Sequence, residues 1–172
     1  HRVDLRRRDA RRQALAVRPL RGQMRGQIPP VAALEGLPDA DGRVANAIEG
    51  TKGWDIWILD VERGTPTRLT FGGGSDNPIW TPDDRRVVYA ATLDGKSGLY
   101  SVMADGSGKP ERLLETSSPA VPSSFTSDGK TLLYATQDSH TQSDLWATRL
   151  DGDRQPFPVI QTPPGPPLPL TR

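Results

Sequence analysis

One block of sequence occurs twice in this chain of 172 residues, and its period constrains the fold more than any other feature. The stretch from Asn77 to Thr92 aligns with the stretch from Pro122 to Gln137 at an offset of 45 residues, which places Trp80 opposite Phe125. A second aromatic position repeats at offsets of 43 and 46 residues, at Trp57, Tyr100 and Trp146. Periods of about 40 to 50 residues with several short strands each are typical of β-propeller blades.

Five Asp-Gly pairs support this interpretation, at positions 41–42, 94–95, 105–106, 128–129 and 151–152. Asp-Gly is a favoured pair where a two-residue hairpin requires positive φ at both central positions, so the pairs predict five tight hairpins. The runs between them are rich in β-branched and aromatic residues. They predict eleven strands between Arg43 and Gln161, in groups of three, four and four.

The composition favours an all-β chain with many turns. Only 34% of the residues are apolar, and the chain holds 17 Gly and 17 Pro. The absence of cysteine excludes disulfide frameworks and thiolate metal sites but does not decide the compartment. There is no run of apolar residues long enough for a membrane span. No signal-peptide pattern is present, so we expect such a peptide to be absent or to lie outside this sequence.

The N-terminal segment, residues 1–37, differs in composition from the repeats. Residues 1–26 hold nine Arg and two Asp, which would suit an acidic surface. Because the first aromatic residue of the chain is Trp54, bases would have nothing to stack on, and we expect no nucleic-acid binding. Residues 9–17 predict at most a weak helix. Two hypotheses for the segment stay open: a basic irregular linker, or an out-of-frame translation of GC-rich DNA.

The C-terminal tail, residues 163–172, is rich in proline and favours polyproline II over a sheet. Pro166 and Pro169 have the P-x-x-P spacing that SH3-like grooves bind. A disordered tail or a cloning remnant explains the same composition, and we expect one of these.

The motifs taken together resemble a known repeat. The strings GWDIWILDVERGTPTRLTF, DNPIWTPDDRRVVYAAT and SSFTSDGKTLLYAT, with SDLWATRLDG after them, follow one another in the order of the TolB-type, WD40-like β-propeller repeat. The resemblance is greatest to the propellers attached to bacterial serine/threonine protein kinases. It implies a partial propeller over residues 38–162, with four-stranded antiparallel blades at about 41–70, 76–115 and 121–162, the first of them incomplete.

Three positions depart from the family pattern. Asp84 stands where the family has Gly, so we expect a different turn type there, and Ser127 replaces the family's Pro. The first blade keeps only Asp41-Gly42, with no recognisable strand before it. Three blades cannot close a ring, since propellers have about four to eight. Exposed strand edges would then invite pairing with another chain, so we expect the isolated polypeptide to be marginally stable or to self-associate.

The repeated aromatic residues have a structural interpretation. Large rings bury much area, so we expect five of them to fill the space between adjacent sheets: Trp57, Trp80, Tyr100, Phe125 and Trp146. For Trp54, an exposed ring that stacks on carbohydrate is the functional alternative.

Catalytic motifs give no site. Residues 90–97 (AATLDGKS) match a relaxed phosphate-loop pattern, but Asp94-Gly95 joins two predicted strands instead of opening a helix. Neither Ser75 nor Ser107 lies in a G-x-S-x-G elbow. The two histidines, His1 and His140, cannot assemble a triad or, without cysteine, a typical zinc site.

Two acidic pairs are candidate calcium ligands. Asp39 with Asp41, and Asp138 with Asp144, lack the spacing of a twelve-residue calcium loop, and we interpret them as turn residues. The sequence therefore predicts no catalytic, cofactor-binding or metal-binding residue and no cofactor, although the parent protein could still be an enzyme.

The resemblance implies a non-catalytic propeller module that binds a protein or peptide partner. Two alternatives place a catalytic domain outside this chain: a sensor propeller of a bacterial serine/threonine kinase, or the gating propeller of a prolyl-oligopeptidase-like serine peptidase. An H-R-D and D-F-G set before His1 would select the first, and a G-x-S-x-G after Arg172 the second. The family resemblance also implies a periplasmic or otherwise extracytoplasmic location.

Overall fold

The structure is a computed structural model, and it describes residues 39–138 and 142–161. The predicted segments at 1–37 and 163–172, and both histidines, lie outside these residues. Eleven strands form three antiparallel sheets. The first sheet contains β1 (Arg43–Gly50), β2 (Gly53–Asp60) and β3 (Thr65–Arg68). The second contains β4 (Ser75–Trp80), β5 (Arg86–Leu93), β6 (Lys96–Met103) and β7 (Glu111–Glu115). The third contains β8 (Ala120–Phe125), β9 (Thr131–Asp138), β10 (Gln142–Arg149) and β11 (Pro156–Ile160).

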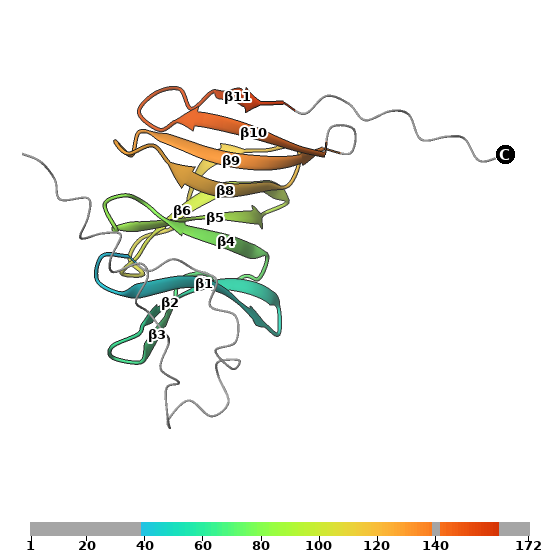
Figure 1. Ribbon diagram of the computed structural model, residues 1–172. Coiled ribbons are helices and arrows are strands. Elements are labelled where there is room, and N and C mark those ends of the chain that lie inside the picture. Colours follow the sequence, from blue (N-terminus) through green and yellow to red (C-terminus); the bar gives the residue numbers. More distant parts are fainter. Residues whose placement is uncertain (1–38, 139–141, 162–172) are drawn as a thin grey trace, which may run out of the picture.

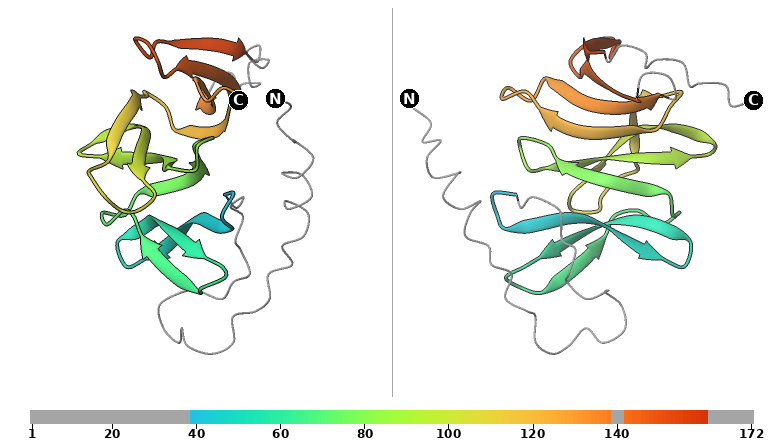
Figure 2. Two further views of the ribbon diagram at one scale, coloured as in Figure 1. Left: turned by 90° about the vertical axis from the view of Figure 1, so that its left-hand side faces the viewer. Right: turned by 45° about the vertical axis from the view of Figure 1, so that its right-hand side comes forward.

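The three sheets stack face to face in chain order, as Figure 1 and both views of Figure 2 show. Strand β4 contacts β1 and β2 on one side and β8 on the other, so the beginnings of the blades converge. The register equates β1 with β5 and β9, because Asn46, Tyr89 and Tyr134 pair with the aromatic residues Trp57, Tyr100 and Trp146. The arrangement confirms the all-β fold class and the predicted grouping of strands.

Two apolar layers hold the sheets together. The layer between the first and second sheets includes Ile56, Ile58, Val87 and Val102. A second layer joins the second and third sheets through residues such as Leu99 and Leu132. Burying such side chains contributes about 1.5 to 3 kcal/mol each, so the stacking of blades is the main source of stability.

The prediction for the aromatic residues is confirmed only in part. Tyr100 is buried, and Trp80, Phe125 and Trp146 are partly buried against the two layers. Trp57 belongs to neither layer, because it lies on the face of the first sheet opposite Ile56 and Ile58, which pack on the second sheet.

The rings that are almost completely buried are Tyr89 and Tyr134. They lie on β5 and β9, which have a strand on each side within the sheet and another sheet against their face. The repeat alignment contains both tyrosines, but it does not show that their strands are central.

A four-residue turn before β5 recurs before β9. In the second sheet the amide of Asp84 donates to the carbonyl of Thr81 at 2.9 Å, and in the third Gly129 donates to Thr126 at 2.8 Å. Asp84 has a φ of +57° and Gly129 one of +72°. The expectation of a different turn at Asp84 is therefore wrong, because aspartate tolerates the left-handed region better than most residues.

The Asp-Gly prediction is right for one pair. Only Asp94-Gly95, between β5 and β6, has positive φ at both residues, +52° and +74°. At 41–42, 105–106 and 128–129 only the glycine is left-handed, and at 151–152 neither residue is. In two of these turns the aspartate acts through its side chain: Asp105 Oδ1 accepts from the amide of Ser107 at 2.8 Å, and Asp128 Oδ1 accepts from the amide of Lys130 at 3.1 Å. In such Asx turns aspartate is favoured because its side chain accepts a hydrogen bond from the backbone, and not because it adopts a positive φ.

Candidate functional site

A shallow groove of about 220 Å³ lies where the blades converge. It is lined by residues of β1, β4 and β8, and we call it the inner groove: Ala45, Asn46, Ala47, Asp76, Asn77, Pro78, Ile79, Val121 and Pro122. Strand β4 is central to this surface, because it contacts β1 on one side and β8 on the other. No residue of the predicted catalytic candidates lines it.

Bulges shape the wall of the inner groove. In β4 the register shifts between Asp76 and Ile79, so that Asn77 and Pro78 together oppose a single residue of β5. Asn77 has a φ of +52°, and its amide donates to Asp76 Oδ1 at 2.7 Å. Bulges bend a strand and turn its side chains in a new direction, and they are frequent next to functional sites.

Strand β8 carries an equivalent irregularity between Pro122 and Ser124. Pro78 and Pro122 are tolerated here because β4 and β8 are edge strands, where a missing amide breaks no ladder bond. The groove therefore has two prolines in its walls, and these stiffen the backbone that a ligand would meet.

The chemistry of the groove divides into two parts. Asp76 and Asn77 are exposed on one side, and they offer a carboxylate and an amide. The other side is apolar: Val121 is 40% exposed, and the half-buried Ala47 and Ile79 add to it. A carboxylate and an amide beside an apolar surface can bind an extended peptide.

A second polar cluster lies between β2 and the segment after β3, and it is structural. Asp55 is 1% exposed and forms an ion pair with Arg68. Its Oδ1 accepts from the Thr70 hydroxyl at 2.9 Å and from the Gly73 amide at 3.1 Å, while Thr70 Oγ1 accepts from the Ile56 amide at 2.8 Å. Every bond closes within the first blade and its exit loop, so this cluster holds the chain and is not free to bind a ligand.

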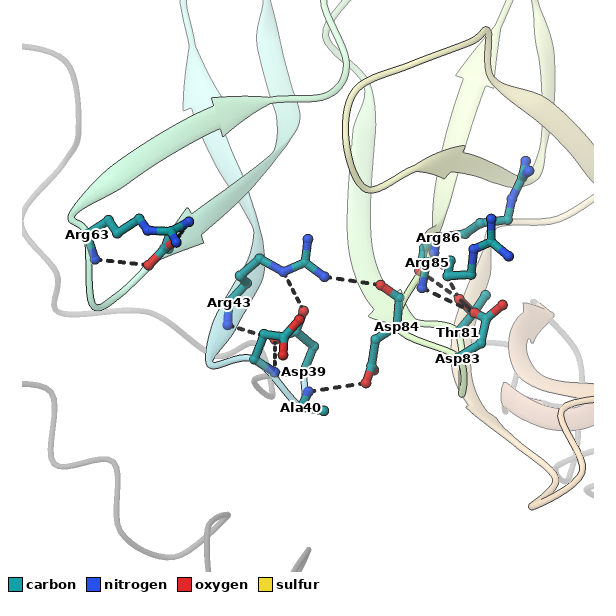
Figure 3. A network of polar contacts seen from close by, with 11 residues as sticks. Asp39, Ala40, Arg43, Arg63, Thr81, Asp83, Asp84, Arg85 and Arg86 are labelled. Carbon is teal, nitrogen blue, oxygen red and sulfur yellow. Dashed lines mark hydrogen bonds and ion pairs between the residues drawn. The ribbon is translucent and has the colours of Figure 1, made fainter.

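A third polar network joins the first two sheets, and Figure 3 shows it. Asp84 accepts from the Ala40 amide at 3.2 Å through its carboxylate, and its carbonyl accepts from Arg43 Nη2 at 3.2 Å. The carboxylate of Asp39 accepts from Arg43 Nε at 2.6 Å and from two backbone amides. The acidic pair at 39 and 41 thus belongs to a turn, as predicted, and Asp39 is occupied by these donors.

The repeated turns also perturb acidity. The hydroxyl of Thr81 donates to Asp83 Oδ1 at 2.6 Å, which is the main reason that the pKa of Asp83 lies below its ordinary value. Thr126 does the same for Asp128 at the same distance and lowers the pKa of that carboxyl. Both shifts come from local hydrogen bonds in turns and identify no acid or base catalyst.

The phosphate-loop candidate is a hairpin. Residues 90–97 run from β5 through the Asp94-Gly95 turn into β6, and Thr92 Oγ1 lies 2.8 Å from Ser97 Oγ across the two strands. No helix N-terminus follows Lys96, so the amides cannot converge on an anion.

The serine candidates lie apart from each other. Ser75 is buried at the start of β4, and Ser107 is exposed in the turn after β6.

Asp144 is buried in β10, at the position where β2 has Asp55. Among the described residues, no group of three or more His, Cys, Asp or Glu side chains could hold a metal ion. Nor do the described residues include a helix long and apolar enough to cross a membrane.

Comparison with known proteins agrees with this geometry. The chain superposes on a TolB-like protein from Agrobacterium tumefaciens with a TM-score of 0.63 and 22% identity, over 74% of this chain and 50% of that one. It also superposes on TolB from Acinetobacter baumannii with a TM-score of 0.60 and 21% identity, over 72% of this chain and 32% of that one. The fold is that of a TolB-like β-propeller.

The TolB-like fold also occurs in larger proteins. A prolyl endopeptidase matches with a TM-score of 0.55 and 18% identity, over 72% of this chain and 21% of that one. In sequence, 55 residues are 36% identical to an uncharacterized protein of Agrobacterium fabrum, which is 31% of this chain and 19% of that protein. No family model matches. The chain thus spans half or less of the proteins that it resembles, and its three sheets are part of a propeller.

Sequence reasoning did not identify the inner groove. Its signal was present in Asn77-Pro78, a pair that favours turns and that stands inside a strand-like run. Such a pair within a strand indicates a bulge, but only the stacking of the sheets shows that the bulge faces a groove.

Proposed function

We propose that this chain is a non-catalytic TolB-like propeller module that binds an extended segment of a protein partner in the inner groove. The observation that carries the proposal is the combination of exposed Asp76 and Asn77 with the exposed apolar surface of Val121. Small binding sites commonly have an apolar lining with few polar groups that fix orientation.

The open backbone of the inner strands supports a peptide as the ligand. Strands β4 and β8 each pair with only one neighbour within their sheets, so part of their main chain is free to bond another chain. Asp76 gives the groove a negative charge, which favours a ligand with a lysine or arginine beside an apolar residue.

Selection from a phage-displayed random peptide library, followed by titration of the selected peptides against the purified chain, tests the proposal. We expect cationic, partly apolar peptides whose affinity falls about tenfold or more with Asp76→Lys, since a charge reversal at a binding site costs more than about 1.4 kcal/mol. Glu62→Lys is the matched control, because Glu62 is exposed in the turn after β2 and lies outside the groove. Peptides that bind both variants as tightly as the parent would rule out the inner groove.

A second candidate is the gating propeller of a serine peptidase, and the similarity of fold to a prolyl endopeptidase supports it. The sensor propeller of a serine/threonine kinase is the further alternative that the repeat sequence suggests. The sequence that surrounds this chain in its open reading frame distinguishes them: a kinase set upstream selects the sensor, and a G-x-S-x-G downstream selects the gate. Neither motif in a complete frame would leave the binding module alone.

A further inference from the structure

The five Asp-Gly pairs differ in the hydrogen bonding of the glycine amide. In three pairs this amide donates to a main-chain carbonyl: Gly42 to Asp39 at 3.3 Å, Gly106 to Met103 at 3.0 Å and Gly129 to Thr126 at 2.8 Å. The amides of Gly95 and Gly152 have no hydrogen-bond partner among the residues that the structure describes. One dipeptide thus occurs in a bonded group of three and a free group of two.

The glycine nitrogen matters because it can attack the side chain of the preceding aspartate, and glycine has no Cβ to shield it. A C–N bond forms between this nitrogen and the aspartate Cγ, and the carboxyl hydroxyl leaves with the amide proton as water. Water then opens the resulting five-membered ring at the former main-chain carbonyl and gives isoaspartate, an isomer of the same mass. An amide that donates to a carbonyl must first break that hydrogen bond.

The aspartate side chains differ in the same way. In the bonded group Asp105 and Asp128 each accept from the amide two residues further on, at 2.8 and 3.1 Å, which holds their carboxylates in place. In the free group Asp94 and Asp151 are exposed and accept no hydrogen bond from a described residue. The Nζ of Lys130 lies 4.0 Å from the Asp151 carboxylate, an exposed pair that solvent screens.

Within the free group, only one pair lies outside a tight turn. Leu93 and Lys96 pair directly across the Asp94-Gly95 turn, and the ladder of β5 and β6 continues from them. Ring closure rotates the main chain between aspartate and glycine, so at this hairpin it would break the strand pairing that fixes the turn. The hairpin therefore protects Asp94 although its glycine amide is free.

The pair Asp151-Gly152 lies in the loop between β10 and β11, and neither residue has a positive φ. A Cβ added at Gly152 would meet nothing within 4 Å, so the main chain has room to rotate. We propose that Asp151 is the position at which this chain converts to isoaspartate, through attack of the Gly152 nitrogen on its side chain. The proposal does not rest on the inner groove.

The product lengthens the main chain by one methylene group between two anchored residues. The Leu150 amide donates to the Lys130 carbonyl at 2.8 Å. On the other side of the pair, Arg154 Nη2 forms an ion pair with Glu111 of the second sheet at 2.9 Å. The added methylene displaces one anchor relative to the other, so we expect conversion to weaken the contact between the second and third blades.

Peptide mapping of the full chain, kept folded at neutral pH and body temperature, tests the proposal. Trypsin releases the pairs separately, because a lysine or arginine lies between each two of them. We expect isoaspartate to accumulate in the peptide 150–154 at least about fivefold faster than in those with Asp105 or Asp128, where a hydrogen bond of ordinary net strength must break first. In urea the rates should converge, because all five pairs share one dipeptide.

Equal rates for the five pairs in the folded chain would overturn the proposal, and so would conversion of Asp94 as fast as that of Asp151. Gly152→Ala then identifies the reacting residue, since the peptide 150–154 also contains Asp153. The alanine Cβ shields the nitrogen that attacks Asp151, so the variant should stop the conversion. Isoaspartate that still forms in Gly152→Ala comes from Asp153 and contradicts the assignment.

Melting temperatures before and after the incubation test the effect on the blades. The parent and Gly152→Ala should melt alike at the start, because the added Cβ has space. After the same incubation the parent should melt at a lower temperature than the variant. Equal melting temperatures in a parent sample that has converted would contradict the expected weakening.

Discussion

The first and second blades differ in the contacts that hold two neighbouring strands together. The difference lies near the start of β2 in the first blade and at the equivalent position of β6 in the second. In the first blade Asp55 is buried and pairs with Arg68 across the strands. In the second blade the equivalent residue is Gly98, which leaves no carboxylate for Arg112, the counterpart of Arg68. Arg112 instead forms an ion pair at the surface with Glu115, at 2.7 Å.

The difference shows that the repeat conserves a strand arrangement and not a set of contacts. Gly98 allows the main chain of β7 to come so close that an added Cβ would lie 2.1 Å from the Leu114 carbonyl oxygen. The first blade keeps its strands together with a buried charge, and the second with a close approach of backbone and apolar packing. One position cannot carry both arrangements, because an aspartate side chain would occupy the space into which the neighbouring backbone comes at Gly98.

The largest loss of stability is expected when the buried aspartate of the first blade is introduced at the equivalent position of the second blade. Gly98→Asp forces a side chain into the backbone of β7 and should destabilise the chain by more than about 4 kcal/mol, the range of severe core clashes. Urea unfolding followed by tryptophan fluorescence measures it. Gly152→Ala is the control, because nothing lies within 4 Å of the added Cβ, and it should be almost neutral. Wild-type stability of Gly98→Asp would show that the two devices are interchangeable.

Removing the buried aspartate of the first blade should cause the next largest loss of stability. Asp55→Ala leaves Arg68, the Thr70 hydroxyl and the Gly73 amide without their acceptor, and breaking a buried pair in this way costs about 3 to 5 kcal/mol. Asp60→Ala removes the half-buried partner of the exposed Arg63 side chain, and the loss of this surface ion pair should cost only about 1 kcal/mol. Thermal melts of both variants decide the matter, and equal losses would mean that the buried network adds nothing to the blade.

The comparison extends to the turns before β5 and β9. Gly129→Ala keeps the turn but places a Cβ on a residue with a φ of +72°, which should cost about 1 kcal/mol. The added Cβ would meet Pro82 only at an ordinary contact distance of 3.5 Å, so the loss measures backbone conformation alone. Asp84→Gly, the reverse change in the second blade, should be neutral or slightly stabilising in the same melts. A loss with Asp84→Gly would show that its carboxylate bond to Ala40 outweighs the backbone term.

Two tyrosines of the second blade differ in whether their hydroxyl group forms a hydrogen bond among the described residues. Tyr100 Oη donates to the Lys96 carbonyl at 3.0 Å, whereas Tyr89 Oη is buried without a hydrogen-bond partner among the described residues. Tyr100→Phe should therefore cost about 1 kcal/mol, and Tyr89→Phe should be neutral or stabilising. Burial raises the pKa of Tyr89 to about 12, which agrees with a hydroxyl held away from water. Denaturant midpoints of the two variants that fall in the opposite order would contradict this assignment.

The smallest expected effect is on the stability of the chain at acidic pH. Hydrogen bonds from Thr81 and Thr126 lower the folded-state pKa values of Asp83 and Asp128 below their value in the unfolded chain, about 3.9. Their contribution is therefore present above that pH and is lost as the pH falls through the folded pKa values. Stability measured between neutral pH and acid should fall less steeply for Thr126→Val than for the parent. An unchanged slope would show that the turn hydroxyl does not set the acidity of Asp128.

Much of the fold could be predicted from the sequence, because blades are local. The period that joins Trp80 to Phe125 identified the repeat, and the runs between turns gave the number and grouping of the strands. The turn at Asp84 was predicted wrongly, since sequence shows which residue departs from a pattern but not which φ the substitute adopts.

The binding site was not predictable in the same way. Asp76 and Asn77 are separated from Val121 by more than 40 residues, and nothing in either segment indicates that they line one groove. The sequence predicts no catalytic set, and the structure shows that residues 90–97, the phosphate-loop candidate, form a hairpin.

The sequence by itself determined which segments become strands, where they turn, and that the units repeat, because hydrophobic alternation and turn chemistry act over a few residues. Only the tertiary structure decided which faces are covered. Leu114 and Ile160 occupy the same position in consecutive blades, yet one is buried and the other exposed. Burial depends on the neighbouring sheet, and a repeat carries the same face whether or not that neighbour exists.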